Sequence, residues 1–243
     1  MPTALMAVSE RQGFFASLRM TNVWECSEES VEQSSPEFMS EEYKHVLARP
    51  LSEKFEQAFD CAFELHQTQG RQSRKGKDTP YIAHLMAVCS IVLEYGGDEE
   101  EAIAALLHDA VEDQGGRPTL EAIRIKFGER VAGIVLECSD SEGDPKPPWR
   151  IRKQTYIDHI PHMTPGARIV SLADKIHNAR SVLNDFRREG ESTWARFKGK
   201  REGTLWYYAE LARKFLEVKS DPMALELKRI VDALEREAAA GPH

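Results

Sequence analysis

His108, Asp109, Glu112 and Asp113 are side chains that can bind a metal ion or move protons, and they lie close together in the sequence. On a helix, residues three and four positions apart are neighbours, so His108 is expected beside Glu112 and Asp109 beside Asp113. Apolar residues occupy the opposite face, at Ile103, Leu106, Leu107, Ala110 and Val111. Imidazoles and carboxylates are ligands of divalent metals, and carboxylates also orient or deprotonate water. The pattern predicts a helix over Glu99 to Asp113 with chemical groups on one side.

Two other apolar segments are needed to complete a site around this helix. Ala167 to Ala179 contains Asp174, and Thr79 to Val92 contains His84 among apolar neighbours. An ionised aspartate in an apolar helix needs a counter-charge or a metal. Two histidines and two aspartates from three helices can form a mixed nitrogen and oxygen site. The spacing alone does not select among manganese, iron, zinc and magnesium, and an isolated His-Asp pair is more often part of a solvated face.

Several segments occur in an order that is similar to one family. They are RKGKDTPYIAH (Arg74 to His84), AALLHDAVED (Ala104 to Asp113), KFGERV (Lys126 to Val131), PGARIVSLADKIHNAR (Pro165 to Arg180) and a late Trp-Tyr-Tyr (Trp206 to Tyr208). Together they resemble the hydrolase domain of the RelA/SpoT-homologue family of HD-domain phosphohydrolases. The resemblance covers about Ser52 to Lys219 and is nearest to the stand-alone small alarmone hydrolases.

The resemblance implies a metal centre and a catalytic pair. The implied metal ligands are His84, His108, Asp109 and Asp174, which would hold one divalent ion, Mn²⁺ by preference, with other divalent metals possible. Glu112 and Asp113 would not be ligands. They would orient the attacking water or transfer its proton.

The resemblance also implies substrate contacts. Arg74 and Lys75 would line the nucleotide pocket, with the arginine stacking on guanine. Asn178 would contact the ribose and Tyr207 the sugar and phosphate, with Tyr208 as an alternative alignment. Further basic contacts stay unassigned among Lys146, Arg150, Arg152 and the run Lys198 to Arg201.

The implied activity is metal-dependent removal of the 3′-pyrophosphate from ppGpp or pppGpp, which gives GDP or GTP and pyrophosphate. One alternative is a broader nucleotide phosphohydrolase, for example one that acts on the 2′-phosphate of NADPH. Another is a non-catalytic HD module that binds nucleotide. Such a module is expected to have lost a metal ligand or the Glu-Asp pair, and this chain keeps them all.

Composition argues against some classes of binding partner, namely nucleic acids and membranes. A net charge of −8 over 243 residues argues against general nucleic-acid binding. No apolar run approaches the roughly 20 residues of a membrane span, and the N-terminus has no secretory signal pattern. Four cysteines without CxxC spacing predict reduced thiols in a cytoplasmic protein. The sequence does not indicate the oligomeric state.

The chain is predicted to be an all-α HD-domain helical bundle with a metal site between helices. Residues 1–50 are expected to be a poorly ordered N-terminal extension, because Ser and Glu cluster there without sustained periodicity. Residues 51–219 would form the hydrolase domain, in which Thr79 caps the His84 helix and Pro80 opens it. Residues 220–243 would be a C-terminal amphipathic helix and tail, packed on the domain or on a partner chain. No synthetase or regulatory segment follows, so the hydrolase is expected to stand alone.

Overall fold

The computed structural model describes residues 51–68, 73–74, 76–113, 115–139 and 147–241. The elements in these ranges are all helices, and the only strand-like pairing there is an isolated bridge between Ser73 and Pro80. The all-α prediction is confirmed. No helix in the described ranges has the length and apolar character needed to cross a membrane. The predicted extension, residues 1–50, lies outside the described residues.

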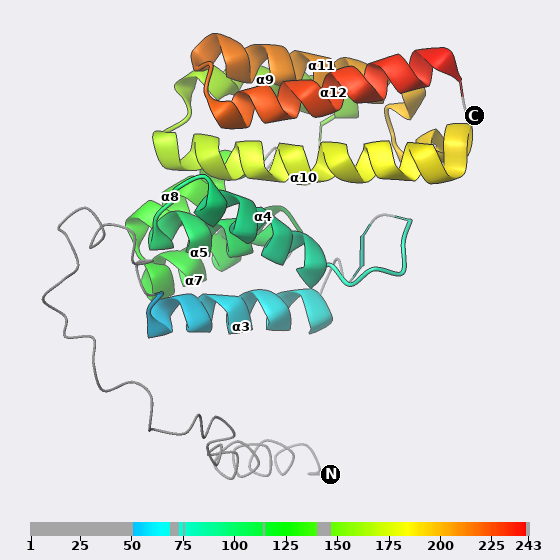
Figure 1. Ribbon diagram of the computed structural model, residues 1–243. Helices are drawn as coiled ribbons and strands as arrows, with labels where there is room; N and C mark the ends of the chain where they lie inside the picture. Colours follow the sequence, from blue (N-terminus) through cyan, green and yellow to red (C-terminus); the bar gives the residue numbers. More distant parts are fainter. Residues whose placement is uncertain (1–50, 69–72, 75, 114, 140–146, 242–243) are drawn as a thin grey trace, which may run out of the picture. The chain divides into compact units, whose positions relative to one another are not determined.

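Figure 1 shows how the helices are arranged. They are α3 (Glu53–Thr68), α4 (Ile82–Glu94), α5 (Glu99–Leu107), α6 (Ala110–Asp113), α7 (Arg117–Phe127), α8 (Glu129–Cys138), α9 (Trp149–His159), the 3-10 helix η3 (Ile160–His162), α10 (Pro165–Glu189), the 3-10 helix η4 (Gly190–Arg196), α11 (Lys200–Val218) and α12 (Pro222–Ala240). Figure 1 shows α10 between two groups, with α9, α11 and α12 on one side and α4, α5, α7 and α8 on the other.

The central helix α10 is buried along most of its length. Thr164 caps it, since the threonine hydroxyl accepts a hydrogen bond from the Ala167 amide, and Pro165 occupies its first turn. Its buried apolar residues include Val170, Leu172, Ala173, Ile176 and Ala179, and α10 contacts helices of both groups. Asp174 lies in the middle of this apolar run and is 7% exposed. The carboxylate is therefore carried into the interior by the helix that the rest of the fold packs against.

The predicted continuous helix over Glu99 to Asp113 is divided in the structure. α5 ends at Leu107, His108 and Asp109 form a turn, and α6 begins at Ala110. The carbonyl of Ala105 would accept a hydrogen bond from the Asp109 amide in an uninterrupted helix. It instead lies 2.8 Å from Nδ1 of His108. The expected start of the preceding helix was also wrong: α4 begins at Ile82, and Thr79 does not cap it.

The C-terminal helix α12 packs on the domain, against α10 and α11. Its apolar residues Leu227, Val231 and Leu234 are buried. Two ion pairs join it to α10, one between Arg180 and Glu226 at 2.9 Å and one between Arg187 and Glu237.

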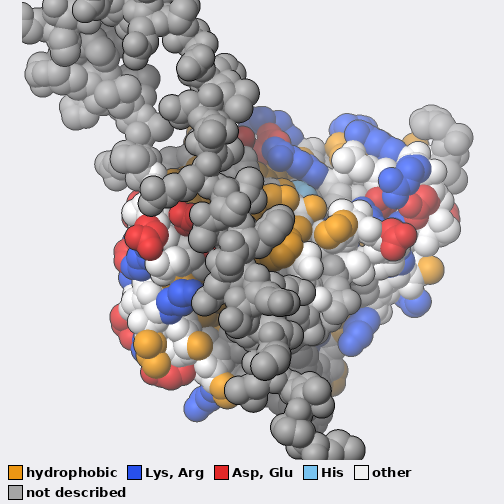
Figure 2. Space-filling model, turned by 90° about the horizontal axis from the view of Figure 1, so that it is seen from below, with side chains coloured by type: hydrophobic (Ala, Val, Ile, Leu, Met, Phe, Trp, Pro, Cys, Tyr) orange, Lys and Arg blue, Asp and Glu red, His pale blue; other side chains and the backbone are white. Residues whose placement is uncertain are grey.

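The opposite end of the molecule, viewed from the α3 side in Figure 2, shows hydrophobic side chains with charged ones around them.

The start of α5 provides a test of how the helix before the His108 turn is held. The Asp98 side chain accepts from the Glu101 amide while the Glu101 side chain accepts from the Asp98 amide, which is a capping box. Asp98→Ala is expected to lower the free energy of unfolding by about 1 kcal/mol. Asp98→Asn keeps the capping oxygen and loses only the exposed ion pair with Arg130, so it should cost less than half as much. Chemical denaturation measures both, and equal losses would mean that the charge rather than the cap matters.

Candidate metal centre and substrate pocket

Two imidazoles and two carboxylates meet where α4, α10 and the turn between α5 and α6 come together. His84 Nε2 lies 3.2 Å from Asp174 Oδ1, and His108 Nε2 lies 3.2 Å from Asp109 Oδ2. The two crossed distances, His84 to Asp109 and His108 to Asp174, are both 3.7 Å. Ligand atoms of His84, His108 and Asp109 all lie within 4.8 Å of one another. The structure thus brings the four expected ligand residues together.

Hydrogen bonds on the far side of each ring leave both Nε2 atoms directed at the carboxylates. The Ala105 carbonyl can only accept, so Nδ1 of His108 carries a hydrogen, and Nε2 presents a lone pair once its own proton is lost. Nδ1 of His84 lies 2.7 Å from Nδ1 of His177. Both Nε2 atoms are buried and have no well-aligned hydrogen bond within the described residues. This arrangement is typical of metal-binding histidines, whose second nitrogen is held by a neighbour.

Charge at this centre also favours a cation. Burial lowers the pKa of His84 to about 4, so that ring is neutral. Burial lowers the pKa of His108 as well, but the carboxylates of Asp109 and Asp174 outweigh it and raise that pKa to about 10. Burial raises the pKa values of both aspartates, yet the imidazoles, and Lys175 beside Asp174, hold them well below their usual range. Without a metal His108 therefore carries a proton that a bound ion would displace, and two ionised carboxylates beside the neutral His84 favour a divalent cation.

Neighbouring side chains hold each carboxylate in place. The hydroxyl of Tyr81 donates to Asp109 Oδ2. Lys175 Nζ lies 2.6 Å from Asp174 Oδ2, and the Asn178 amide donates to Asp174 Oδ1. The sequence did not indicate the roles of Tyr81 and Lys175, nor that of His177 beside His84. His177 lies three residues after Asp174 on α10, a spacing that places the two side chains on neighbouring positions of one face.

The expected catalytic pair is only partly described. Glu112 in α6 lines the cavity next to the metal centre, and Arg152 of α9 places Nη1 3.8 Å from Glu112 Oε1. Arg152 is buried at 9% exposure. It was among the basic residues left unassigned from the sequence. Asp113 ends α6, and its side chain lies outside the described residues.

A cavity of about 340 Å³ extends from the metal centre between α9, α10 and α11. This volume is in the usual range for small-ligand sites. Asp109 and Asp174 line it, and so do these basic residues: Arg74, Lys77, Arg152, Lys153, Lys175 and Lys198. A local group of cations therefore faces the cavity although the whole chain is acidic.

The expected substrate contacts fall at this cavity where they are described. Arg74 and Asn178 line it, and Arg74 Nη2 lies 2.7 Å from Asn178 Oδ1. Tyr207 and Tyr208 both line it, so the geometry does not choose between the two alignments. Lys75 lies outside the described residues.

The other basic residues that the sequence leaves unassigned lie in different places in the structure. Lys198 lines the cavity, whereas the guanidinium of Arg150 lies over the Trp206 ring. Lys146 lies outside the described residues.

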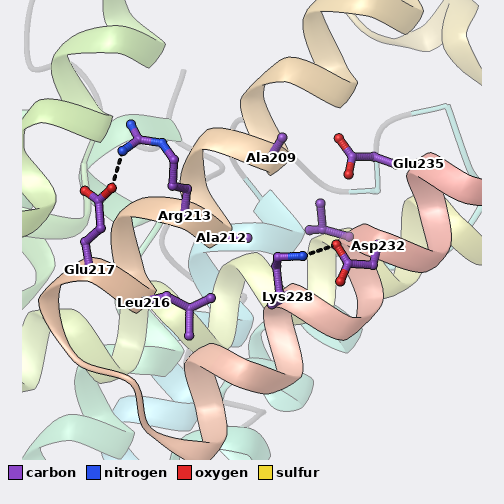
Figure 3. Close-up of a pocket in the computed structure, with 9 residues that line it drawn as sticks. Ala209, Ala212, Arg213, Leu216, Glu217, Lys228, Asp232 and Glu235 are labelled. Carbon is purple, nitrogen blue, oxygen red and sulfur yellow. Dashed lines mark hydrogen bonds and ion pairs between the residues drawn. The ribbon is translucent and has the colours of Figure 1, made fainter.

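A second hollow lies between α11 and α12 (Figure 3). Arg213 is paired there with Glu217, and Lys228 with Asp232. Its lining includes no histidine or cysteine among the described residues. Because these charges neutralise each other in pairs and metal-binding nitrogen or sulphur is absent from that lining, we do not place the chemistry there.

Comparison with known proteins identifies the family of this chain. The family model described as HD domain matches residues 58–205. The chain belongs to the HD-domain family. Relatives of this HD-domain chain include MESH1 of Xenopus tropicalis and of Homo sapiens, both named guanosine-3′,5′-bis(diphosphate) 3′-pyrophosphohydrolase. They are 39% and 38% identical to it over 128 residues, which is 52% of this chain and 68% of each relative.

Solved structures give the same picture. One described as a metazoan ortholog of SpoT that hydrolyzes ppGpp matches the HD-domain chain with a TM-score of 0.62 and 26% identity, covering 79% of this chain and 99% of that one. A crystal structure from Listeria monocytogenes matches with a TM-score of 0.55 and 28% identity over 63% of this chain and 99% of that one. The resemblance to RelA/SpoT-type hydrolases is confirmed.

The contact between His84 and His177 can be tested through metal affinity. His177→Phe removes the nitrogen that holds Nδ1 of His84, so affinity for Mn²⁺ is expected to fall roughly 10- to 100-fold. His162→Phe changes an exposed histidine outside the cavity and should leave affinity unaltered. Calorimetric titration of metal-free protein measures both, and equal affinities would remove His177 from the metal centre.

Proposed function

We propose that this chain is a metal-dependent hydrolase that removes the 3′-pyrophosphate of ppGpp or pppGpp, giving GDP or GTP and pyrophosphate. The observation that carries the proposal is the meeting of His84, His108, Asp109 and Asp174 at one end of a cavity lined by cations. The relatives named as guanosine-3′,5′-bis(diphosphate) 3′-pyrophosphohydrolases support the choice of substrate.

His84, His108, Asp109 and Asp174 would hold one divalent ion, and we propose Mn²⁺. When bound, such an ion lowers the pKa of a water molecule and neutralises charge on the phosphate under attack. The chain's own contribution is to fix the donors. The Ala105 carbonyl and His177 orient the two imidazoles, and Lys175 holds the oxygen of Asp174 that faces away from His84.

Glu112 would orient the attacking water and accept its proton, with Asp113 assisting. Glu112 lies on the short helix that directly follows the Asp109 ligand and lines the same cavity. Arg152, 3.8 Å from its carboxylate, would hold that carboxylate in place. The water oxygen would then bond to the phosphorus attached to the ribose 3′ oxygen. The bond between that phosphorus and the 3′ oxygen would break, and the 3′ oxygen would take up a proton.

Cations and hydrogen-bonding groups along the cavity would bind the rest of the nucleotide. Arg74 would stack on the guanine, and Lys75 would line the same part of the pocket. Asn178 would contact the ribose and Tyr207 the sugar and phosphate. Arg152, Lys153 and Lys198 supply positive charge for phosphate groups.

Two substitutions separate the metal centre from proton transfer. Asp109→Ala is expected to abolish both metal binding and turnover, because it removes a ligand. Glu112→Ala should bind metal normally and lose roughly 10²- to 10⁴-fold in kcat. Glu217→Ala, in the hollow of Figure 3, is the control and should behave like the unaltered chain. Metal content and kcat measured on the same preparations test this, and ordinary rates for Glu112→Ala would remove that residue from the mechanism.

The substrate is tested by incubating the full chain and Mn²⁺ with ppGpp, pppGpp or NADPH and separating the products by chromatography. We expect GDP or GTP with pyrophosphate, and no reaction in the presence of chelator. Release of phosphate from NADPH alone would favour the broader phosphohydrolase. Tight nucleotide binding without any product would favour the non-catalytic module.

A further inference from the structure

Two hydroxyl groups on α11 are buried at the cavity with no hydrogen-bond partner among the described residues. Thr204 is 3% exposed and Tyr207 is 7% exposed. Within the part of the chain that the structure describes, neither Thr204 Oγ1 nor the Tyr207 hydroxyl makes a hydrogen bond. Both residues line the cavity, whereas Ala209, Ala212 and Leu216 on the other face of α11 line the hollow of Figure 3. Thr204 and Tyr207 thus belong to the cavity face of this helix, and their hydroxyls are buried there.

An unpartnered buried hydroxyl is unfavourable, so each one needs an explanation. Threonine within a helix commonly donates to the carbonyl four residues earlier, and Thr204 does not. Valine has nearly the same shape and would fill the position without a polar atom. A partner that enters the cavity would satisfy both groups.

The surroundings indicate the chemistry of that partner. Lys153 and Lys198 line the same cavity, and Lys153 Nζ lies 4.9 Å from the centre of the Tyr207 ring. The Trp149 indole packs against Gly199 and Gly203, where an added Cβ would come within 2.6 Å and 3.2 Å of the indole ring. Hydroxyl donors next to ammonium groups suit the oxygens of a phosphoryl group.

We propose that Thr204 is a substrate-binding residue whose hydroxyl, together with that of Tyr207 one turn later, hydrogen-bonds a phosphoryl group of the nucleotide. The proposal rests on the proposed function for the identity of the nucleotide. Thr204 was not singled out from the sequence.

Thr204→Val separates a role in substrate binding from a structural role. Loss of a substrate contact alone would raise KM without lowering the melting temperature, whereas loss of a structural contact would lower the melting temperature. Thr204→Val should raise KM for ppGpp roughly 10-fold with kcat within about twofold, since a hydrogen bond to a charged group is lost. Its melting temperature without ligand should equal or exceed that of the unaltered chain. Thr204→Ser should restore KM, and Tyr207→Phe should show the same pattern as Thr204→Val.

Thr193 offers a matched control. It is fully buried, its hydroxyl also has no hydrogen-bond partner within the described residues, and it does not line the cavity. Thr193→Val should therefore match Thr204→Val in its effect on melting temperature and leave KM unchanged. An unchanged KM in Thr204→Val, or an equal rise in Thr193→Val, would overturn the proposal.

Binding of fragments by the full chain with Mn²⁺ identifies the phosphoryl group. Calorimetry with GDP, pyrophosphate and guanosine should show weaker binding of GDP or pyrophosphate to Thr204→Val and no change for guanosine. Loss confined to GDP assigns the contact to the 5′-phosphates, and loss confined to pyrophosphate assigns it to the group removed. Unchanged binding of both, or no binding of either by the unaltered chain, would overturn the inference. If the chain does not turn over ppGpp but Thr204→Val still binds GDP or pyrophosphate more weakly, only the proposed function is contradicted.

Discussion

The structure depends on the burial of one carboxylate, that of Asp174, in the middle of its central helix. An ionised group in such a place must be compensated by charge and hydrogen bonds, or it would be protonated. Here Lys175 and Asn178 from the same helix contact it, and His84 faces it from α4. The compensation is supplied by residues of different elements, so the packing of α10 against its neighbours and the assembly of the site are one requirement.

The turn at His108 and Asp109 meets the same requirement from the other side. The ring of His108 bonds the Ala105 carbonyl and ends α5 there, which brings both side chains toward Asp174. The short helix that follows then brings Glu112 to the cavity. A break in helical structure thus places two expected ligands and the expected catalytic carboxylate within one short stretch. Cations on α9 and α10 surround the cavity, so an acidic chain can still present a positive local surface to a phosphorylated ligand.

The fold class and the four expected ligands could be predicted because they depend on local patterns: helical periodicity, and the order of motifs that resemble one family. The division of the helix at His108 could not be predicted, because helical periodicity does not indicate that an imidazole ring will hydrogen-bond a backbone carbonyl. His177, Tyr81 and Lys175 were missed for a related reason. His177 meets His84, and Tyr81 meets Asp109, only once distant segments have packed, although the spacing of His177 from Asp174 was available as a signal. Lys175 contacts its own neighbour Asp174 on α10, and periodicity does not indicate that contact. The failure of Thr79 as a cap has a local cause: Ser73 pairs with Pro80, and the Arg74 amide donates to the Thr79 carbonyl at 2.8 Å.

The most direct test of this account is the position of the metal itself. Anomalous diffraction from crystals of the full chain grown with Mn²⁺ should give one strong peak, bounded by Nε2 of His84 and His108 and by carboxylate oxygens of Asp109 and Asp174. A manganese peak elsewhere, or one that leaves either imidazole uncoordinated, would contradict the central claim that these four side chains form a single metal centre.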